Sequence, residues 1–290
     1  MVGSARSGTT LLRLMLNAHP EVAVPPESRF IVELWKGDEV IDADGFLATL
    51  ASHKRFIAWD LPIATVTDEL GHGQKPYAEC IAATYRAYAH VHGKTLWGDK
   101  TPRYIESLPL LARLFPEASF IHLVRDGRDV ALSYADVPFG PKTIAKAASL
   151  WRERVLVGVE TGRPLGSERY LELRYESLVS DANEEIKALC EWLGFAFDPG
   201  MLDYTEKARE SMLPRAEKYN PHLTESPTRR TRDWSRDMPE SQVEVFEAVA
   251  GDALERLGYE RRYPAPATSA RIKAALGRYG VPVGKLQSHR

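Results

Sequence analysis

The stretch that decides the fold is residues 1–17, which read MVGSARSGTTLLRLMLN. It begins with an apolar pair, continues into a turn of small and hydroxyl-bearing residues, and ends in leucines spaced to form one face of a helix. This is the strand, turn and helix order of a phosphate-binding loop, whose backbone amides and helix N-terminus bind anions. The alternative interpretation is a tight turn that only closes a strand onto a helix.

The spacing within this turn is close to that of a Walker A loop. Gly3 and Gly8 match its two glycines, and Thr10 occupies the position of its magnesium-binding hydroxyl. The lysine that reaches the β- and γ-phosphates in that motif is replaced by Thr9. A cation lies inside the turn instead, at Arg6, whose guanidinium can bind two oxygens at once. The turn therefore disfavours an ordinary ATPase or kinase and favours another phosphorylated donor.

The composition is that of a soluble globular protein. The 290 residues are 44% apolar and 27% charged, and a net charge of −2 gives no basic field that would favour nucleic acid. We expect one domain at 1–263 and a peripheral basic tail at 264–290. Since no stretch has the apolar length of a membrane-spanning helix and the N-terminus does not resemble a signal peptide, we expect a cytoplasmic protein without a transmembrane anchor.

The cysteines and histidines give no sign of a metal site. Cys80 and Cys190 are the two cysteines of the chain, and they lie far apart in sequence. We expect two reduced thiols, with a single disulfide as the alternative. The histidines show no HExxH or other ligand spacing, so no metal is expected.

Strand and helix patterns alternate along the chain after the first unit. The sequence predicts strands at 22–24, 95–98, 119–124 and 169–173, and helices at 103–115, 143–161, 181–193 and 240–257. Strands that alternate with helices form a parallel sheet covered on both faces. We therefore predict a three-layer α/β fold like that of P-loop NTPases, with a central parallel sheet of about four or five strands flanked by helices.

Polar residues follow several of these strands, at the edge where open α/β sheets bind ligands. Glu27 follows a proline-rich extended segment and is either a general base or a helix N-terminal acid favoured by the helix dipole. Lys100 follows another predicted strand, with a solvated loop lysine as the alternative. Arg125 ends the strongest strand, and Ser133 lies about two turns into the next helix. Together, Arg125 and Ser133 form a candidate second phosphate site.

Residues 208–238 interrupt the alternation with three prolines and a basic run, TRRTRDW at 228–234. Loops of this length in compact domains are usually functional or disordered. We predict a lid or nucleotide-binding loop here, with a solvated basic run as the alternative.

Two phosphate sites on one sheet, neither with a Walker lysine, suit a nucleotide that carries both a 5′- and a 3′-phosphate. In these motifs the chain resembles the sulfotransferases that use 3′-phosphoadenosine 5′-phosphosulfate (PAPS), above all tyrosylprotein sulfotransferases and bacterial sulfotransferase domains. Their 5′-phosphosulfate loop is similar to the run Arg6-Ser7-Gly8-Thr9-Thr10. Their 3′-phosphate motif is similar to Arg125, within LVRDGR, together with Ser133. The resemblance covers about residues 1–260.

The resemblance implies a role for each matched residue. Glu27 would take the proton of the acceptor hydroxyl, Lys100 would neutralise charge on the bridging oxygen, and Arg6 would be the third catalytic residue. Arg29 would shape the acceptor pocket, and Tyr175 would contact the nucleotide. PAPS would be the cosubstrate and 3′,5′-adenosine bisphosphate (PAP) the product. Because a sulfuryl group carries less charge than a phosphoryl group, arginine, lysine and amides could serve without a metal.

The chain departs from the tyrosylprotein branch in its closing segment. The lysine that precedes the closing tryptophan is replaced by Asp233, next to Trp234. We therefore expect Arg230 or Arg232 to supply that cation and bind the donor.

Two further positions differ from that branch and bear on the acceptor. Thr224 and Ser226 are the candidate counterparts of a late serine, and a basic arginine after the 3′-phosphate serine is replaced by Val137. We expect the acceptor hydroxyl to belong to a small molecule, lipid or natural product rather than to a protein tyrosine. An atypical P-loop kinase and a non-catalytic nucleotide-binding module are the alternatives, and the sequence is compatible with a homodimer.

Overall fold

The computed structural model describes residues 1–205 and 233–278. The predicted lid at 208–238 falls mostly outside these described residues, as do four candidates of its sequence: Thr224, Ser226, Arg230 and Arg232.

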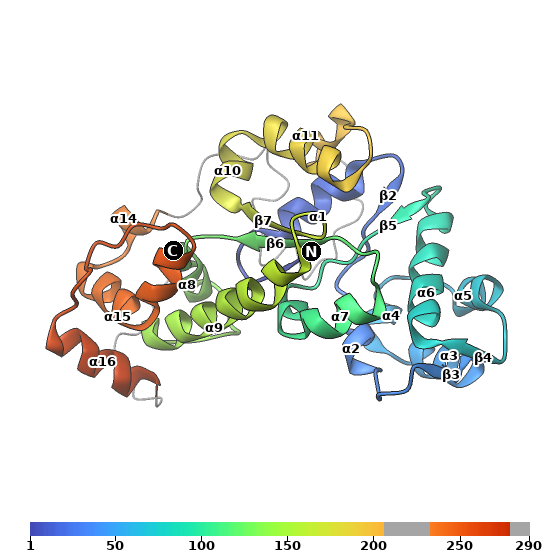
Figure 1. Ribbon diagram of the computed structural model, residues 1–290, viewed down its shortest axis with the longest axis horizontal. Helices are drawn as coiled ribbons and strands as arrows, with labels where there is room; N and C mark the ends of the chain where they lie inside the picture. Colours follow the sequence, from blue (N-terminus) through green and yellow to red (C-terminus); the bar gives the residue numbers. More distant parts are fainter. Residues whose placement is uncertain (206–232, 279–290) are drawn as a thin grey trace.

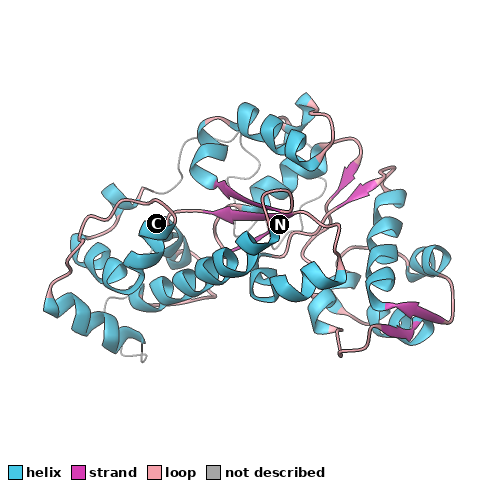
Figure 2. Cartoon of the chain, viewed as in Figure 1, coloured by secondary structure: helices cyan, strands magenta, loops and turns pink. Residues whose placement is uncertain are grey.

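The central sheet of the described residues contains parallel strands in the order β1-β6-β7. These strands are β1 (Val2–Gly3), β6 (Phe120–Val124) and β7 (Tyr170–Arg174). Figure 2 shows strands in magenta near the middle of the molecule, with helices on either side. Gly3 pairs with Leu123, and Val124 pairs with Arg174, so all three strands end near one edge of the sheet. Every residue of β6 is buried, as expected of a parallel strand covered on both faces.

Helices cover both faces of this sheet (Figure 1). On one face, Ile121, Leu123 and Leu173 share a buried apolar cluster with α1 (Thr9–Ala18), α10 (Tyr175–Ser180) and α11 (Ala182–Leu193). On the other face lies α9 (Ile144–Gly162), where a side chain at Gly158 would collide with His122 of β6. The two layers of helices and the sheet between them confirm the predicted three-layer α/β class.

A mostly helical region connects β1 and β6 in sequence and packs beside the sheet. Its aromatic core includes Phe30, Trp59 and Tyr85, with Tyr85 stacked on Trp97 at 4.7 Å between ring centroids. Its elements are β2 (Val22–Ala23), α2 (Phe30–Glu33), β3 (Val40–Asp42), α3 (Ala43–Ala51), α4 (Lys54–Ile57), α5 (Ile63–Leu70), β4 (Gln74–Pro76), α6 (Tyr77–Val91), β5 (Leu96–Trp97), a 3-10 helix (Pro102–Ser107) and α7 (Leu108–Leu114).

The last helices pack against α9 rather than against the strands (Figure 1). Ala270 and Ala274 of the final helix are buried with residues of α9 and its neighbours. The remaining elements are α8 (Gly127–Ala135), two 3-10 helices (Arg163–Leu165 and Pro199–Met201), α14 (Trp234–Asp237), α15 (Glu240–Arg256) and α16 (Thr268–Arg278).

Two predicted elements differ in detail. Strands β2 and β5, which we expected in the central sheet, pair in parallel with each other, so within residues 1–205 and 233–278 the sheet has three strands rather than four or five. Pro25 and Pro26 follow β2 closely, and prolines cannot donate the hydrogen bonds that would extend its ladder. The helix predicted at 103–115 is a 3-10 helix followed by α7, because Pro109 lacks the N–H that a continuous helix would need there.

A buried ion pair joins the start of α8 to the C-terminal helices. Arg128 Nη1 lies 2.7 Å from Glu247 Oε1, and the two side chains are 2% and 0% exposed. Glu247 also accepts hydrogen bonds from the backbone N–H groups of Arg262 and Tyr263. Arg128 donates in addition to both carboxylate oxygens of Asp126.

Replacing Glu247 by leucine should strongly destabilise the fold. Glu247→Leu leaves a buried guanidinium with one partner fewer and two backbone N–H groups unsatisfied, which costs about 3–5 kcal/mol of unfolding free energy. Glu255→Leu is the control, because Glu255, also on α15, pairs with Arg261 but is 60% exposed, and it should cost under about 1 kcal/mol. Urea denaturation of both variants measures the difference, and equal losses would contradict the assignment.

Candidate active site

The turn after β1 has the backbone of an anion-binding loop. Gly8, immediately before α1, has a φ of 92°, and a Cβ there would overlap the Tyr175 ring. Arg6 has a φ of 73°, a left-handed conformation that is uncommon for a residue with a side chain. Ser7 Oγ is buried and has no hydrogen-bond partner in the described part of the chain. The turn therefore presents the Ser7 hydroxyl, together with the N-terminus of α1 at Thr9 and Thr10, for binding an anion.

The structure brings the two predicted phosphate motifs together. Arg6 Nε donates a hydrogen bond to Ser133 Oγ of α8 at 3.0 Å, across 127 residues of sequence. Arg125 Nη1 lies 3.3 Å from the carbonyl oxygen of Arg6. The prediction that both turns meet at one edge of the sheet is confirmed.

Arg125 is held in place but keeps hydrogen-bonding capacity. The residue is 5% exposed, and its guanidinium lies 4.4 Å from the centre of the Tyr175 ring. Its Nε and Nη2 atoms are buried without a partner among residues 1–205 and 233–278. Buried guanidinium N–H groups are costly to leave unsatisfied, so this geometry fits an anionic ligand such as a phosphate.

Glu27 and Lys100 form a second cluster. Lys100 Nζ donates to Glu27 Oε1 at 2.9 Å, with side-chain exposures of 6% and 27%. Burial alone would raise the pKa of Glu27, but Lys100, with further help from Arg55 and Arg29, reverses this effect and holds the pKa below its usual value. Burial lowers the pKa of Lys100, against the opposing attraction of Glu27. The pair is therefore a buried ammonium group, on Lys100, hydrogen-bonded to a partly exposed carboxylate, on Glu27.

Hydroxyl groups fix the chain neighbours of this pair. Ser28 Oγ donates to Asp99 Oδ2 at 2.7 Å, and Tyr85 OH donates to the same oxygen at 2.6 Å. Thr101 Oγ1 lies 3.2 Å from it. Burial raises the pKa of Asp99, against which the hydrogen bonds from Tyr85, Ser28 and Thr101 act. Because Ser28 adjoins Glu27 and Asp99 adjoins Lys100, this network restrains both members of the ion pair.

Arg29 and Arg55 add positive charge around Glu27. Arg29 precedes α2 with a φ of 56°, and its buried Nε has no partner within the described residues. Arg55 lies on α4 and contributes to lowering the pKa of Glu27. Sequence reasoning identified Arg29 but missed Arg55, which stands in an ordinary-looking basic pair, Lys54-Arg55, without a motif.

Asp129 is another residue that sequence reasoning missed. Burial, with the negative charges of Asp126 and Glu176, raises its pKa to about 7, although Arg125 opposes this shift. Asp129 Oδ1 accepts a hydrogen bond from the backbone N–H of Trp234 at 2.8 Å. The available signal was its position as an acidic residue in the first turn of the helix that follows Arg125.

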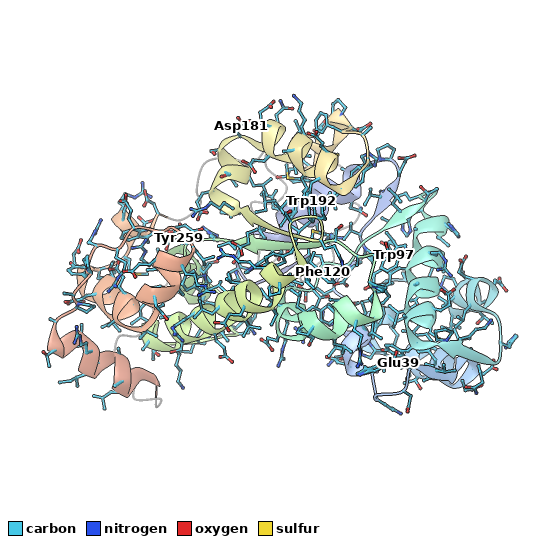
Figure 3. All side chains as sticks on the ribbon, in the orientation of Figure 1. Glu39, Trp97, Phe120, Asp181, Trp192 and Tyr259 are labelled. Atoms are coloured by element: carbon cyan, nitrogen blue, oxygen red, sulfur yellow. The ribbon has the colours of Figure 1, made fainter. Side chains whose placement is uncertain are left out.

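Trp234 and Tyr259 close this side of the site. The Trp234 ring lies 3.5 Å from the Arg128 guanidinium carbon. Tyr259, labelled in Figure 3, donates from its hydroxyl to Glu176 Oε2 at 3.0 Å, and Glu176 Oε1 accepts from the backbone N–H of Asp126. Asp233, where the resembling family has a lysine, caps α14 by accepting from the Ser235 backbone.

The described residues show neither a metal-binding cluster nor a membrane-spanning helix. Among residues 1–205 and 233–278, no group of three or more histidine, cysteine or carboxylate side chains could hold a metal ion. Across those same ranges, no helix combines the length and the apolar character needed to cross a membrane. Cys80 and Cys190 are both buried free thiols.

Comparison with known proteins shows which family shares these motifs. The profile described as the sulfotransferase family matches residues 1–199. Protein-tyrosine sulfotransferase A of Caenorhabditis elegans is 24% identical over 89% of this chain and 66% of its own length. Nodulation protein NoeE of Sinorhizobium fredii is 28% identical over 90% of this chain and 65% of its own length. The chain thus spans just under two thirds of the length of these relatives.

A further relative and two solved structures extend the comparison. Omega-hydroxy-beta-dihydromenaquinone-9 sulfotransferase Stf3 of Mycobacterium bovis is 26% identical over 61% of this chain and 44% of its own length. The sulfotransferase domain of a Synechococcus olefin synthase superposes with a TM-score of 0.60 at 23% identity, over 89% of this chain and 94% of its own. The sulfotransferase domain of the curacin biosynthetic pathway gives the same TM-score at 19% identity, over 90% and 96%. These two structures share the fold.

Removing the Lys100 charge should raise the pKa of Glu27 above its usual value. In Lys100→Met the buried carboxylate keeps its burial penalty and loses its main counter-charge, so the protonated form is favoured. Carbon-13 NMR of the glutamate carboxyl groups, titrated with pH, measures the shift. Lys100→Arg keeps the charge and should leave Glu27 nearer to its native titration. An unchanged midpoint in Lys100→Met would show that the ion pair does not control this carboxylate.

Proposed function

The chain belongs to the sulfotransferase family, and on that premise we propose that it transfers a sulfuryl group from PAPS to a hydroxyl group of an acceptor. The observation that carries the proposal is the hydrogen bond between Arg6 Nε and Ser133 Oγ. It joins the turn after β1 to α8 and so brings two candidate anion sites together, as a donor with phosphates at both its 5′ and 3′ positions requires.

The residues present fit such a donor. The turn of Arg6, Ser7 and Gly8, with the start of α1, would hold the 5′-phosphosulfate through backbone N–H groups and the unsatisfied Ser7 hydroxyl. Arg125 and Ser133 would hold the 3′-phosphate, since two buried nitrogen atoms of Arg125 have no partner among the described residues. We also propose that Tyr175, whose ring lies against the Arg125 guanidinium, contacts the nucleotide. Arg230 and Arg232 remain candidates for further donor contacts.

Glu27 and Lys100 would carry the chemistry between donor and acceptor. Glu27 accepts the proton of the acceptor hydroxyl as the hydroxyl oxygen bonds to sulfur. The lowered pKa of Glu27 keeps the carboxylate ionised before the proton is transferred. Lys100 and Arg6 stabilise the negative charge that develops on the bridging oxygen as the bond between sulfur and PAP breaks. The charge thus ends on PAP, the proton on Glu27 and the sulfuryl group on the acceptor, without a metal.

We propose a small molecule, lipid or natural product as the acceptor, held next to Arg29. The names of the relatives cover protein tyrosine and a hydroxylated menaquinone, so the family accepts different hydroxyl groups. Val137, which stands in place of a basic residue of the tyrosylprotein branch, is 3% exposed in an apolar cluster. The Val137 side chain itself therefore offers an acidic peptide no cation, although Lys142 Nζ lies nearby and donates to the Val137 carbonyl oxygen at 2.9 Å.

Calorimetry should show tight binding of PAP and weak binding of ATP with magnesium. Only PAP carries the 3′-phosphate that Arg125 and Ser133 would bind. The protein has Thr9 in place of the lysine that contacts the β- and γ-phosphates of ATP in a Walker A loop. Arg125→Ala should weaken PAP binding by about 10- to 100-fold, as expected for a lost charge-assisted hydrogen bond. Magnesium-dependent ATP binding as strong as PAP binding would support the kinase alternative instead.

Replacing the proposed base should abolish transfer without affecting donor binding. Glu27→Gln should lower the rate of sulfur-35 transfer from PAPS to p-nitrophenol or a long-chain alcohol by about 10²- to 10⁴-fold, with PAP affinity retained. Glu21→Gln, at an exposed glutamate nearby in sequence, is the matched control and should keep full activity. Native turnover in Glu27→Gln would overturn the assignment of the base, and PAP binding without any transfer would favour a non-catalytic module.

A further inference from the structure

A buried arginine that the proposed chemistry does not use lies beneath the Glu27 segment. Arg13 is on α1, the helix that begins at the phosphate loop, and it is 4% exposed. Its Nη1 donates to the carbonyl oxygen of Val24 at 3.0 Å. Asn17, one helical turn further along α1, accepts from the backbone N–H of Val24 at 2.9 Å. One face of α1 therefore holds Val24 by both of its backbone polar groups.

The link from Val24 to Glu27 is short and stiff. Two prolines, Pro25 and Pro26, separate these residues, and each proline ring fixes its own φ angle near −65°. Trp59 Nε1 donates to the carbonyl oxygen of Pro26 at 2.8 Å and so restrains the link from its other side. A displacement of Val24 relative to α1 would therefore be passed on to the Glu27 carboxylate.

Arg13 also contributes to the electrostatics of the ion pair. Burial lowers the pKa of Arg13, while the charges of Tyr88 and, to a lesser extent, Glu27 oppose that shift. The same guanidinium acts on Lys100 and lowers the pKa of that ammonium group. Arg13 thus interacts electrostatically with both Glu27 and Lys100, although it belongs to α1, the helix that follows the donor loop.

We propose that Arg13 is a positioning residue for sulfuryl transfer, which holds the Glu27 and Lys100 pair at a set distance from the donor loop through its hydrogen bond to Val24. This inference rests on the proposed function. Asn17 completes the same contact from the next turn of α1. The loop that would bind the donor and the carboxylate that would accept the proton are then parts of one rigid unit, as in-line transfer requires.

Arg13→Met tests the proposal, because methionine fills a similar volume without the charge or the hydrogen bond. PAP affinity by calorimetry should remain close to native, while turnover of PAPS with p-nitrophenol should fall by about 10- to 100-fold. The amide proton of Val24 should exchange faster with solvent. The pKa of the Glu27 carboxyl is set by burial, Lys100, Arg55 and Arg29. Because Arg13 also interacts with Glu27, its loss should raise that pKa slightly.

Arg169→Met is the matched control. Arg169 also donates to backbone carbonyl groups, those of Phe115 and Ala118, but it lies outside the proposed site and should leave turnover and the Glu27 titration unchanged. Arg13→Lys keeps the charge and should restore part of the turnover. Asn17→Ala, which removes the other contact to Val24, serves if Arg13→Met fails to fold, and it should also lower turnover.

Several outcomes would overturn the proposal. Native turnover together with a native Glu27 titration in Arg13→Met would do so, as would native turnover in Asn17→Ala where Arg13→Met does not fold. Equal effects of Arg13→Met and Arg169→Met would show that both arginines serve stability alone. The Glu27 titration needs neither donor nor acceptor, so a failure of the proposed function, seen as ATP binding without PAP binding, remains distinguishable from a failure of this inference.

Discussion

The parallel pairing of β1 with β6 is the constraint on which the site depends. Because the two strands run in the same direction and Gly3 pairs with Leu123, the turns that follow them leave the same edge of the sheet. Arg6 and Arg125 come from these two turns, 119 residues apart in sequence, and they meet within hydrogen-bond distance. An antiparallel arrangement would place the two arginines at opposite ends of the strands, where they could not act on one nucleotide.

The candidate site concentrates buried charge, which a fold selected for stability alone would avoid. Lys100, Arg125 and Asp129 are each at most 5% exposed. Burying one ion without full pairing costs several kcal/mol, so such residues are usually retained for a function. Pairing is complete at Arg128, which contacts two carboxylates and stacks on Trp234. It is incomplete at Arg125, and this contrast separates a structural arginine from one that can still bind an anion.

The sequence predicted those parts of the site that local patterns encode. A strand, turn and helix pattern identified Arg6, and a second one identified Arg125 and Ser133, because each motif lies within about ten residues. The sequence also suggested Glu27 and Lys100 separately, but it could not show that they pair, since they are 73 positions apart and a helical region lies between them. The three-layer class followed from the alternation of elements, whereas the number of strands in the sheet depended on which short strands find hydrogen-bonded neighbours.

Residues whose role comes from burial were the hardest to predict. An arginine among the leucines of an apolar helix is ordinarily expected at its exposed edge, so Arg13 gave no local signal of being buried. The spacing of Arg13 and Asn17 was visible as a pair on one helix face, but the segment they contact was not. The same applies to Asp129 and Arg55, whose environments are formed by elements from distant parts of the chain.

Backbone strain supports the same location for the site. Within residues 1–205 and 233–278, three residues other than glycine have a positive φ, and two of them are Arg6 and Arg29. A left-handed conformation costs about 1–2 kcal/mol for a residue with a Cβ, and glycine would avoid that cost. Glycine would also remove the guanidinium, so the strain is retained where the charge is needed. Arg6 lies in the donor loop that leads into α1, and Arg29 lies immediately before α2, two residues after Glu27. Backbone strain is thus found at two positions of the candidate site, Arg6 where the donor would bind and Arg29 where the acceptor would bind.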